Sequence, residues 1–377
     1  MDLYEQHKRI FRILGAIAEP YISRKFNLSH AYTPVDGPVL LICNHVCAWD
    51  PLLVGVSLDG NHAYFVASEH LFRLGTATKL LERLLAPIPR RKGSTGMDTV
   101  KACLRHLQAG HSICLFAEGE QCWDGRSAHI FPATGKLARV SGATLVTFRL
   151  EGAYLSLPRW ARTMRRGSVF GHTVGIYSPE HLRGMTPKEI NEIIERDIYE
   201  DAWDRQRQNK VRFRGKRLAE GLERALYACP HCSRIGTLQA RNNRVFCDCG
   251  FAVTYGDTGF LNPAVPFETL ADWDAWQSEL LHGRAFPYEN GLLFTDGGLE
   301  LTRIMPDHSE QLLEVGVLRQ YEDRLVCGEH SFSMAGIHDM AMVQASLLMF
   351  SYHGEYYQLR TRSGVNLRKY LEKWKEK

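Results

Sequence analysis

The 377-residue sequence predicts an α/β fold, with an open sheet and flanking helices, followed by a small module with paired cysteines and a β-rich C-terminal domain. Three observations lead to this prediction. Runs typical of buried strands alternate with helical patterns over the first 150 residues, four cysteines lie in two close pairs after residue 228, and short β-rich runs follow residue 250. The composition, 45% hydrophobic and 23% charged, is that of a folded globular protein.

The first expected element is an amphipathic helix within residues 1–34. Its apolar side chains recur at helical spacing, and they are Ile10, Phe11, Ile13, Leu14 and Ile17. Lys8, Arg9 and Arg12 lie beside them. Such a helix either packs on its own domain or lies on a membrane surface, where a basic flank helps binding.

Residues 35–204 are expected to form the α/β domain. Buried strands are predicted at 38–43, 63–67, 112–116 and 144–150. Helices are predicted between them, at about 51–58, 70–86, 95–109 and 135–141. This alternation is typical of an open sheet covered by helices.

The rest of the chain is expected to form three segments. A basic helical linker is predicted over 205–228, because residues 205–217 contain seven Lys or Arg and no acid. The cysteine module follows at 229–256, and a β-rich domain with a C-terminal helix occupies 257–377. Strands of that domain are predicted near 291–296, 324–328, 346–352 and 355–361, and its helix carries Leu367, Tyr370, Leu371 and Trp374 on one face. This pattern resembles a small pleckstrin-homology-like barrel.

Charge is distributed unevenly along the chain. The formal net charge is +4, but residues 1–228 contain 32 Lys or Arg against 23 Asp or Glu, and residues 229–377 contain 14 against 19. The first part is therefore expected to meet something anionic, either a phosphate-bearing substrate, a membrane surface or nucleic acid.

Targeting signals and cysteine usage both favour the cytoplasm. No stretch approaches the roughly 18 to 20 uninterrupted apolar residues of a spanning helix. The first residues lack the apolar core and small-residue cleavage site of a secretory signal. Six of the ten cysteines are scattered, which does not indicate a disulfide framework.

A candidate catalytic pair lies in residues 44–53, NHVCAWDPLL, directly after a predicted buried strand. His45 and Asp50 can act as a base and its orienting carboxylate, because a carboxylate bonded to one ring nitrogen fixes the tautomer and stabilises the imidazolium. Pro51 favours the start of a helix, which leaves His45 to Asp50 as a turn. The alternative is that Asp50 only caps the helix and His45 is an ordinary strand-end histidine.

A second polar loop, residues 115–127 with the sequence LFAEGEQCWDGRS, follows another predicted strand. Its glycines, Gly119 and Gly125, permit tight turns next to charged residues. The two loops should meet, because open α/β sheets bind ligands at the carboxyl ends of their strands.

These segments resemble the lysophosphatidate and glycerol-3-phosphate acyltransferase superfamily over roughly residues 35–200. His45 and Asp50 match its His-x4-Asp motif, and Arg90 in PIPRR fits the arginine of its second block. Phe116 to Gly119 resembles its FPEG block, and residues 145–152, LVTFRLEG, fit its fourth. The resemblance implies an acyltransferase-type open sheet, and acyl transfer from acyl-CoA or acyl carrier protein to a hydroxyl of a glycerolipid.

In the reaction that the resemblance implies, His45 takes the proton of the acceptor hydroxyl while Asp50 holds the imidazole. This direct route needs no covalent enzyme intermediate and no organic cofactor, so Cys47 is expected to be a buried thiol. Acceptor binding is assigned to four residues, Arg90, Glu118, Gly119 and Arg126. For Glu118 the alternative is a purely structural role in holding the loop.

Two positions depart from the family pattern. Ala117 stands where proline is expected, and Glu120 with Gln121 replaces the segment that normally supplies an arginine. Arginine is the best phosphate ligand because its guanidinium forms a fork of donors. Arg126, in the same loop, is one expected replacement, and Arg90, Arg91 and Lys136 are other candidates. For each of them the alternative is an ordinary solvated surface charge.

The paired cysteines have the spacing of a metal site. Cys229 and Cys232 are followed, after fourteen residues, by Cys247 and Cys249. Four thiolates complete the tetrahedral coordination of Zn²⁺, so a structural zinc ribbon is predicted. The second pair encloses one residue rather than the usual two, and the alternative is a set of free buried thiols.

Together these features predict a bacterial-type cytoplasmic O-acyltransferase, peripheral on the inner face of the cell membrane. Its partners are acyl-CoA or acyl carrier protein, a lysophospholipid and an anionic membrane surface; the expected acceptor is 1-acylglycerol-3-phosphate, giving phosphatidate. The alternatives are a catalytically silent lipid-binding or scaffolding protein and a zinc-ribbon protein that binds nucleic acid. Nucleic acid is not expected, because the basic run 205–217 contains a single aromatic residue, Phe213.

Overall fold

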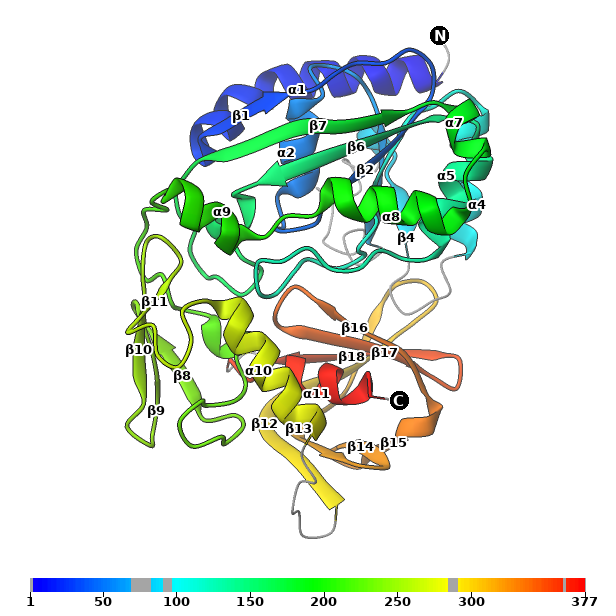
Figure 1. The fold of residues 1–377 in the computed structure, drawn as a ribbon. Helices are drawn as coiled ribbons and strands as arrows, with labels where there is room; N and C mark the ends of the chain where they lie inside the picture. The colour runs from blue at the N-terminus through cyan, green and yellow to red at the C-terminus, as the bar shows by residue number, and fades with distance from the viewer. Residues whose placement is uncertain (1–2, 69–82, 91–96, 284–290, 362–363, 377) are drawn as a thin grey trace. The chain divides into compact units, whose positions relative to one another are not determined.

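The computed structural model describes residues 3–68, 83–90, 97–283, 291–361 and 364–376. The chain divides into two compact units (Figure 1). The first extends to Gly215 without residues 160–163, and the second comprises Trp160–Thr163 and the chain from Lys216 onward. The expected architecture is confirmed: a parallel-rich open sheet with helices lies in the first unit, and the cysteine region and a β-rich C-terminal part lie in the second.

A seven-stranded sheet with the order β1-β7-β6-β2-β5-β3-β4 is the framework of the first unit. Its strands are β1 Leu28–Ala31, β2 Val39–Cys43, β3 Tyr64–Ser68, β4 Ile88–Arg90, β5 Ile113–Phe116, β6 Thr144–Glu151 and β7 Val169–Tyr177. Neighbouring strands are parallel except β6 and β7. Strands β2, β3, β5 and β6 lie where the sequence predicts them. Strand β7 was missed because many of its side chains are partly exposed, so it lacks a continuous apolar run.

The helices of the first unit pack on this sheet. They are α1 Leu3–Phe26, α2 Asp50–Ser57, α4 Met97–Gln108, α5 Ala133–Ser141, α6 Ala153–Ser156, α7 Pro179–Arg183, α8 Pro187–Ile198 and α9 Ala202–Asn209. Of the helix predicted over 70–86, residues 83–86 are among those described, and residues 83–85 are helical.

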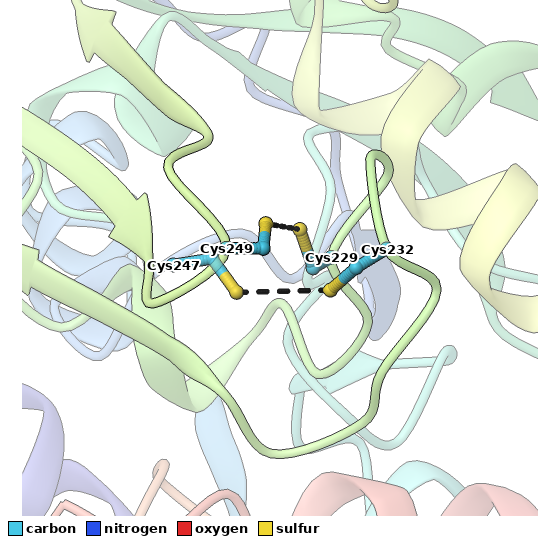
Figure 2. Close-up of side chains that lie close together, drawn as sticks. All are labelled: Cys229, Cys232, Cys247 and Cys249. Carbon is cyan, nitrogen blue, oxygen red and sulfur yellow. Dashed lines mark hydrogen bonds between the residues drawn. The ribbon is translucent and has the colours of Figure 1, made fainter.

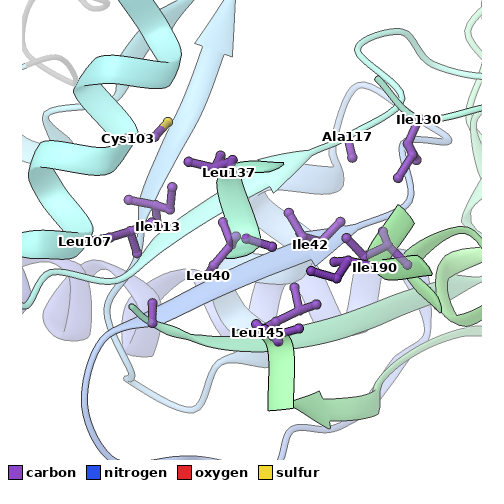
Figure 3. Close-up of a cluster of buried hydrophobic side chains, with 14 of the residues drawn as sticks. Leu40, Ile42, Cys103, Leu107, Ile113, Ala117, Ile130, Leu137, Leu145 and Ile190 are labelled. Carbon is purple, nitrogen blue, oxygen red and sulfur yellow. The ribbon is translucent and has the colours of Figure 1, made fainter. Parts of the chain in front are cut away.

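The main core lies between the sheet and helices α4, α5 and α8 (Figure 3). Leu40 and Ile42, alternate residues of β2, join Leu145 of β6 and Ile190 of α8 in this core. All four side chains are 0% exposed, and full burial of such a side chain contributes roughly 1.5–3 kcal/mol to stability.

Strand register brings three loops to one edge of the sheet. Cys43, the last residue of β2, pairs with Phe116 at the end of β5 and with Phe148 of β6. Asn44 then bridges to β6, because its Nδ2 donates to the carbonyl of Leu150 at 2.9 Å and its Oδ1 accepts the Leu150 amide at 2.8 Å. The chain is therefore fixed at the point where it leaves β2.

The basic run 205–217 is only partly helical. Helix α9 ends at Asn209, and Lys210 adopts a left-handed conformation with φ of 49°. The Gln206 side chain then exchanges two hydrogen bonds with the backbone of Val211. The helix expected across 205–228 therefore stops early, and a short 3₁₀ helix, η2 Leu222–Arg224, is the next helical element among the described residues.

The second unit contains two antiparallel sheets. The first has the order β11-β10-β9-β8, formed by β8 Leu238–Arg241, β9 Arg244–Cys247, β10 Ala252–Tyr255 and β11 Leu261–Asn262. The helix α10 Leu270–Gly283 follows it.

The C-terminal sheet has the order β15-β14-β13-β12-β18-β17-β16. Its elements are β12 Leu292–Ile304, β13 Glu310–Tyr321, β14 Arg324–Cys327, β15 His330–Ser333, η4 Met334–Gly336, β16 Ile337–Val343, β17 Leu347–Tyr352 and β18 Glu355–Thr361, followed by the helix α11 Arg368–Trp374. Tyr370 and Leu371 of α11 are 0% exposed, as the apolar face of the predicted final helix requires.

None of the helices in the described part of the chain is long and apolar enough to cross a bilayer.

Candidate active site and metal site

His45 and Asp50 meet in the turn between β2 and α2. Nδ1 of His45 lies 2.7 Å from Oδ2 of Asp50. Oδ2 also accepts the backbone amides of Val46 at 2.6 Å and Cys47 at 2.9 Å. A carboxylate that accepts these amides fixes the proton of the imidazole on Nδ1, which leaves Nε2 as the basic nitrogen.

The contacts of Asp50 differ from those of a helix cap. Helix α2 begins at Asp50 itself, with Pro51 in its first turn. The carboxylate bonds to the amides of Val46 and Cys47, which precede the helix, rather than to amides within its first turn. Asp50 is 0% exposed, so its negative charge is directed entirely at the turn that carries His45.

Cys47 is a buried thiol beside this pair. Its Sγ donates to Oδ1 of Asp50 at 3.1 Å. Burial, together with the charge and the hydrogen bond of Asp50, holds the pKa of the Cys47 thiol well above its usual value. A thiol in this state is a poor nucleophile, because the thiolate is the reactive form.

Glu118 joins the two polar loops through their backbones. Its Oε1 accepts the amide of His45 at 2.8 Å, and its Oε2 accepts the amide of Ala128 at 2.7 Å. Burial raises the pKa of Glu118 to about 8, although these two amides act in the opposite direction. The sequence leaves two roles open for Glu118, contact with the acceptor and holding the loop, and its two backbone contacts are of the second kind.

Arg90 and Gly119 lie together, as the sequence assignment requires. The Arg90 guanidinium stacks on the ring of Phe131, with Cζ 4.4 Å from the ring centroid. Gly119 has φ of +73°, and a Cβ there would lie 2.2 Å from the Phe131 ring and 3.1 Å from Nη1 of Arg90. Only glycine allows the backbone to approach these two side chains so closely.

Arg126 is engaged elsewhere. Its Nε donates to Oδ2 of Asp201 at 2.8 Å. Asp201 in turn caps helix α9, because its Oδ1 accepts the amides of Trp203 and Asp204. The structure therefore ties Arg126 to the start of α9, and no contact places it with Arg90 among the described residues.

Two residues of the site were not predicted from the sequence. Arg159, with a side chain 2% exposed, contacts Glu120 and Gln121 of the second loop. Phe131 contacts both Arg90 and Gly119. Neither belongs to a recognisable motif. Arg159 comes from a segment distant in sequence, 38 residues after Gln121, and Phe131 lies beyond the end of the 115–127 loop.

The arrangement can perform proton transfer from a hydroxyl. His45 is 19% exposed at its side chain, so it is reachable from solvent, and its ring stacks on Phe116 with centroids 4.6 Å apart. Asp50 fixes its orientation from the buried side. A base held this way needs no reorientation when it takes a proton.

The four predicted metal ligands converge in the second unit (Figure 2). Their Sγ atoms all lie within 4.8 Å of one another. Cys229 and Cys249 are 3.7 Å apart at sulfur, and Cys232 and Cys247 are 3.8 Å apart. A tetrahedral Zn²⁺ with bonds of about 2.3 Å places its sulfur ligands about 3.8 Å apart, so the four thiols fit such an ion.

Each cysteine pair lies on a tight backbone turn. The Ser233 amide donates to the carbonyl of Cys229 at 2.8 Å, and the Gly250 amide donates to that of Cys247 at 3.0 Å. Additional donors approach two of the sulfurs, with Nε of Arg234 3.5 Å from Cys232 and the Thr237 hydroxyl 3.2 Å from Cys247. Such donors stabilise thiolate ligands.

Comparisons with known proteins found one family model and a similar solved structure. Residues 25–151 match the family model described as acyltransferase. The chain is also similar to the crystal structure of PlsC, the 1-acyl-sn-glycerophosphate acyltransferase of Thermotoga maritima, with 18% sequence identity over 50% of this chain and 77% of that chain and a TM-score of 0.41. No curated protein sequence matches the chain.

Proposed function

We propose that this protein is an O-acyltransferase that moves an acyl chain from acyl-CoA or acyl carrier protein to a lysophospholipid. The proposed acceptor is 1-acylglycerol-3-phosphate, which would give phosphatidate. The observation that carries the proposal is the 2.7 Å contact between His45 and Asp50 in the turn after β2. The match of residues 25–151 to the acyltransferase family supports it.

In the proposed reaction the acceptor hydroxyl attacks the thioester carbonyl. Nε2 of His45 takes the hydroxyl proton as the carbon–oxygen bond forms, and Asp50 stabilises the resulting imidazolium. When the tetrahedral intermediate collapses, the carbon–sulfur bond breaks and the imidazolium returns the proton to the leaving thiolate. General base catalysis of this kind contributes about 10²- to 10⁴-fold to the rate.

Arg90 is the residue that we assign to the acceptor phosphate. It lies against Gly119 in the loop whose Glu118 holds the His45 amide. Burial lowers the pKa of Arg90 from its usual value, but an arginine remains charged near neutrality. Arg90 therefore supplies a positive charge beside the loop whose Glu118 holds the His45 amide.

We propose that the protein attaches reversibly to the inner face of the cell membrane. Helix α1 exposes four large apolar side chains, Leu3, Ile13, Ile17 and Tyr21. Phe11 belongs to the opposite face, because its ring lies 3.6 Å from the Cβ position of Gly55 in α2. The outward apolar residues, with exposed Arg9 and Arg24 nearby, have the character of a surface-binding helix.

The basic run 205–217 offers a second membrane contact. Arg205 is paired with Glu151 and Arg207 with Asp204. Exposed basic side chains follow along the same segment, and they are Lys210, Arg212, Arg214, Lys216 and Arg217. Each such residue contributes about 1 kcal/mol near an anionic bilayer.

We propose that the cysteine cluster holds one structural zinc ion. Cys229, Cys232, Cys247 and Cys249 would complete its coordination, which leaves no open position for a catalytic water. The sulfur separations of 3.7 and 3.8 Å support zinc. The ion would stabilise the turns of the second unit and take no part in acyl transfer.

The test is to incubate the purified protein with acyl-CoA, or with acylated carrier protein, and a panel of lysolipids, and to follow thiol release. We expect acceptor-dependent release that is fastest with 1-acylglycerol-3-phosphate. Absence of release with every donor and acceptor would favour a silent lipid-binding protein. Salt-sensitive binding to DNA but not to anionic liposomes would favour the nucleic-acid alternative.

A further inference from the structure

A buried arginine, Arg159, contacts the loop that follows β5 and flanks the candidate base. The side chain of Arg159 is 2% exposed. Its Nη1 donates to the carbonyl of Gln121 at 2.7 Å and lies 3.6 Å from Oε2 of Glu120. Its Cζ lies 3.9 Å from the ring centroid of Trp123. Arg159 therefore contacts three residues of one short loop.

That loop is tied directly to the backbone of His45. The amide of Cys122 donates to the His45 carbonyl at 3.0 Å. Tyr154 and Trp203 hold the rest of the loop, by donating to the carbonyls of Trp123 at 2.9 Å and Asp124 at 2.8 Å. Among Arg159, Tyr154 and Trp203, the charged donor is Arg159.

The charge of Arg159 is placed against Glu120. The side chain of Glu120 is 28% exposed. Glu120 also acts on Arg90, since its charge raises the pKa of that guanidinium against the effect of burial. One carboxylate is thus within electrostatic range of two arginines, one partly exposed and one buried.

We propose that Arg159 is a positioning residue. Its buried guanidinium neutralises the charge of Glu120, so that the headgroup site at Arg90 keeps a net positive charge. This inference rests on the proposed function, because it takes a phosphate-bearing lysolipid as the ligand of Arg90. Arg159 is too deeply buried to contact the acceptor itself. It acts by setting the charge and the position of Glu120.

Glutamine variants separate this charge effect from a merely structural one. In Arg159→Gln, the Glu120 carboxylate loses a cation and repels the acceptor phosphate, which should weaken acceptor binding roughly tenfold. Adding Glu120→Gln to that variant removes the repelling charge, so binding should return to within about twofold of the original protein. A structural defect would not be rescued in this way. Glu120→Gln alone should bind the acceptor at least as tightly as the original protein.

The measurement is calorimetric binding of a short-chain 1-acylglycerol-3-phosphate, below its micelle concentration and without acyl donor. Arg159→Lys keeps the charge and should bind nearly normally, and it covers the case in which Arg159→Gln fails to fold. Arg183→Gln, which removes an exposed arginine paired with Glu180 on α7, is the control and should change nothing.

Equal weakening in the Arg159→Gln single variant and in the double variant would overturn the inference, as would unchanged binding in Arg159→Gln. Thiol release by the original protein is recorded separately with the same acceptor and acyl-CoA or acylated carrier protein. The expected binding pattern without thiol release would contradict the proposed reaction alone. Thiol release with the wrong binding pattern would contradict the role of Arg159 alone, and no acceptor binding to the original protein would contradict both.

Discussion

Oε1 of Glu118 accepts the backbone amide of His45 at 2.8 Å, although the two residues are 73 positions apart. The other oxygen of the same carboxyl group accepts the amide of Ala128 at 2.7 Å. A single buried side chain thereby joins the loops that follow β2 and β5. The position of the candidate base depends on this side chain as well as on Asp50.

Glu118→Gln should therefore misplace His45. The amide group of glutamine presents a donor to one of the two N–H groups, and an unsatisfied buried pair costs about 1–3 kcal/mol. We expect a lower melting temperature and a lower kcat in thiol release. Glu192→Gln, on the exposed side of α8, is the matched control. Unchanged kcat in Glu118→Gln would contradict the positioning role.

Asp50→Asn should lower kcat by roughly 10²-fold or more, because an amide cannot stabilise the imidazolium and disturbs the tautomer of His45. The acceptor KM should change little. Circular dichroism should show that the fold is retained. If kcat stays at the original value, Asp50 has only a structural role in the turn.

Cys229→Ser should reduce bound zinc from one equivalent per chain, as measured by elemental analysis, and should lower the melting temperature. Prolonged treatment with a strong chelator should have the same effect on the original protein. Cys327→Ala is a suitable control, because Cys327 is a buried cysteine of β14 outside the cluster. Original protein that contains no zinc after purification would contradict the zinc site. An unchanged melting temperature in Cys229→Ser would also contradict it.

Acid should weaken the packing around His62. Burial, followed by the positive charges of His7, His111, Lys8 and His106, lowers the pKa of His62 from 6.5 to about 4. The unfolded chain therefore binds a proton that the folded chain excludes between these values, so stability is present above pH 6.5 and is lost as the pH falls toward 4.

His62→Phe should reduce this loss, because phenylalanine does not titrate and can keep the ring contacts of His62 with Tyr4, Phe11 and Tyr64. The melting temperature is measured from pH 7 to pH 4.5. His129→Gln, which changes a histidine whose side chain is 98% exposed, is the control. Identical slopes for His62→Phe and the original protein would contradict the assignment.

Replacing Arg212, Arg214, Lys216 and Arg217 together by glutamine should weaken sedimentation with anionic liposomes at low salt. Exposed charges are screened within about 8 Å at physiological ionic strength, so binding should also fall as salt is added. The apparent KM for a membrane-presented acceptor should rise, while turnover on a water-soluble short-chain acceptor should stay nearly unchanged.

The matched control for this variant removes the same charge from other exposed positions. It replaces Lys136, Arg139, Arg183 and Lys188 of helices α5, α7 and α8 by glutamine. Liposome binding of the control should resemble that of the original protein. Equal binding of both variants and the original protein across the salt series would mean that the basic run is a solvated linker.

The sequence predicted those parts of the fold whose signal is local. Strand β2 was predictable because all five of its residues are buried and apolar, and the turn of His45 and Asp50 was predictable because Pro51 limits where the helix begins. The cluster of four cysteines was predictable from their spacing.

Other features depend on contacts between distant segments. Strand β7 pairs antiparallel with β6 across partly exposed residues, which gives no periodic signal. Arg159 was not predicted because its partners, Glu120 and Gln121, lie almost forty positions earlier in the chain. Arg126 was assigned to the acceptor from its place in the loop, but the sequence does not show that Asp201 engages its guanidinium.

The most direct test of the account is the turnover number of His45→Ala in acceptor-dependent thiol release, with Cys47→Ala measured beside it. Both residues lie in the same turn, but only His45 is assigned a proton-transfer role. We expect kcat of His45→Ala to fall at least about 10²-fold with the fold intact, and Cys47→Ala to keep most of its activity. Near-normal turnover in His45→Ala would contradict the assignment of His45 as the base.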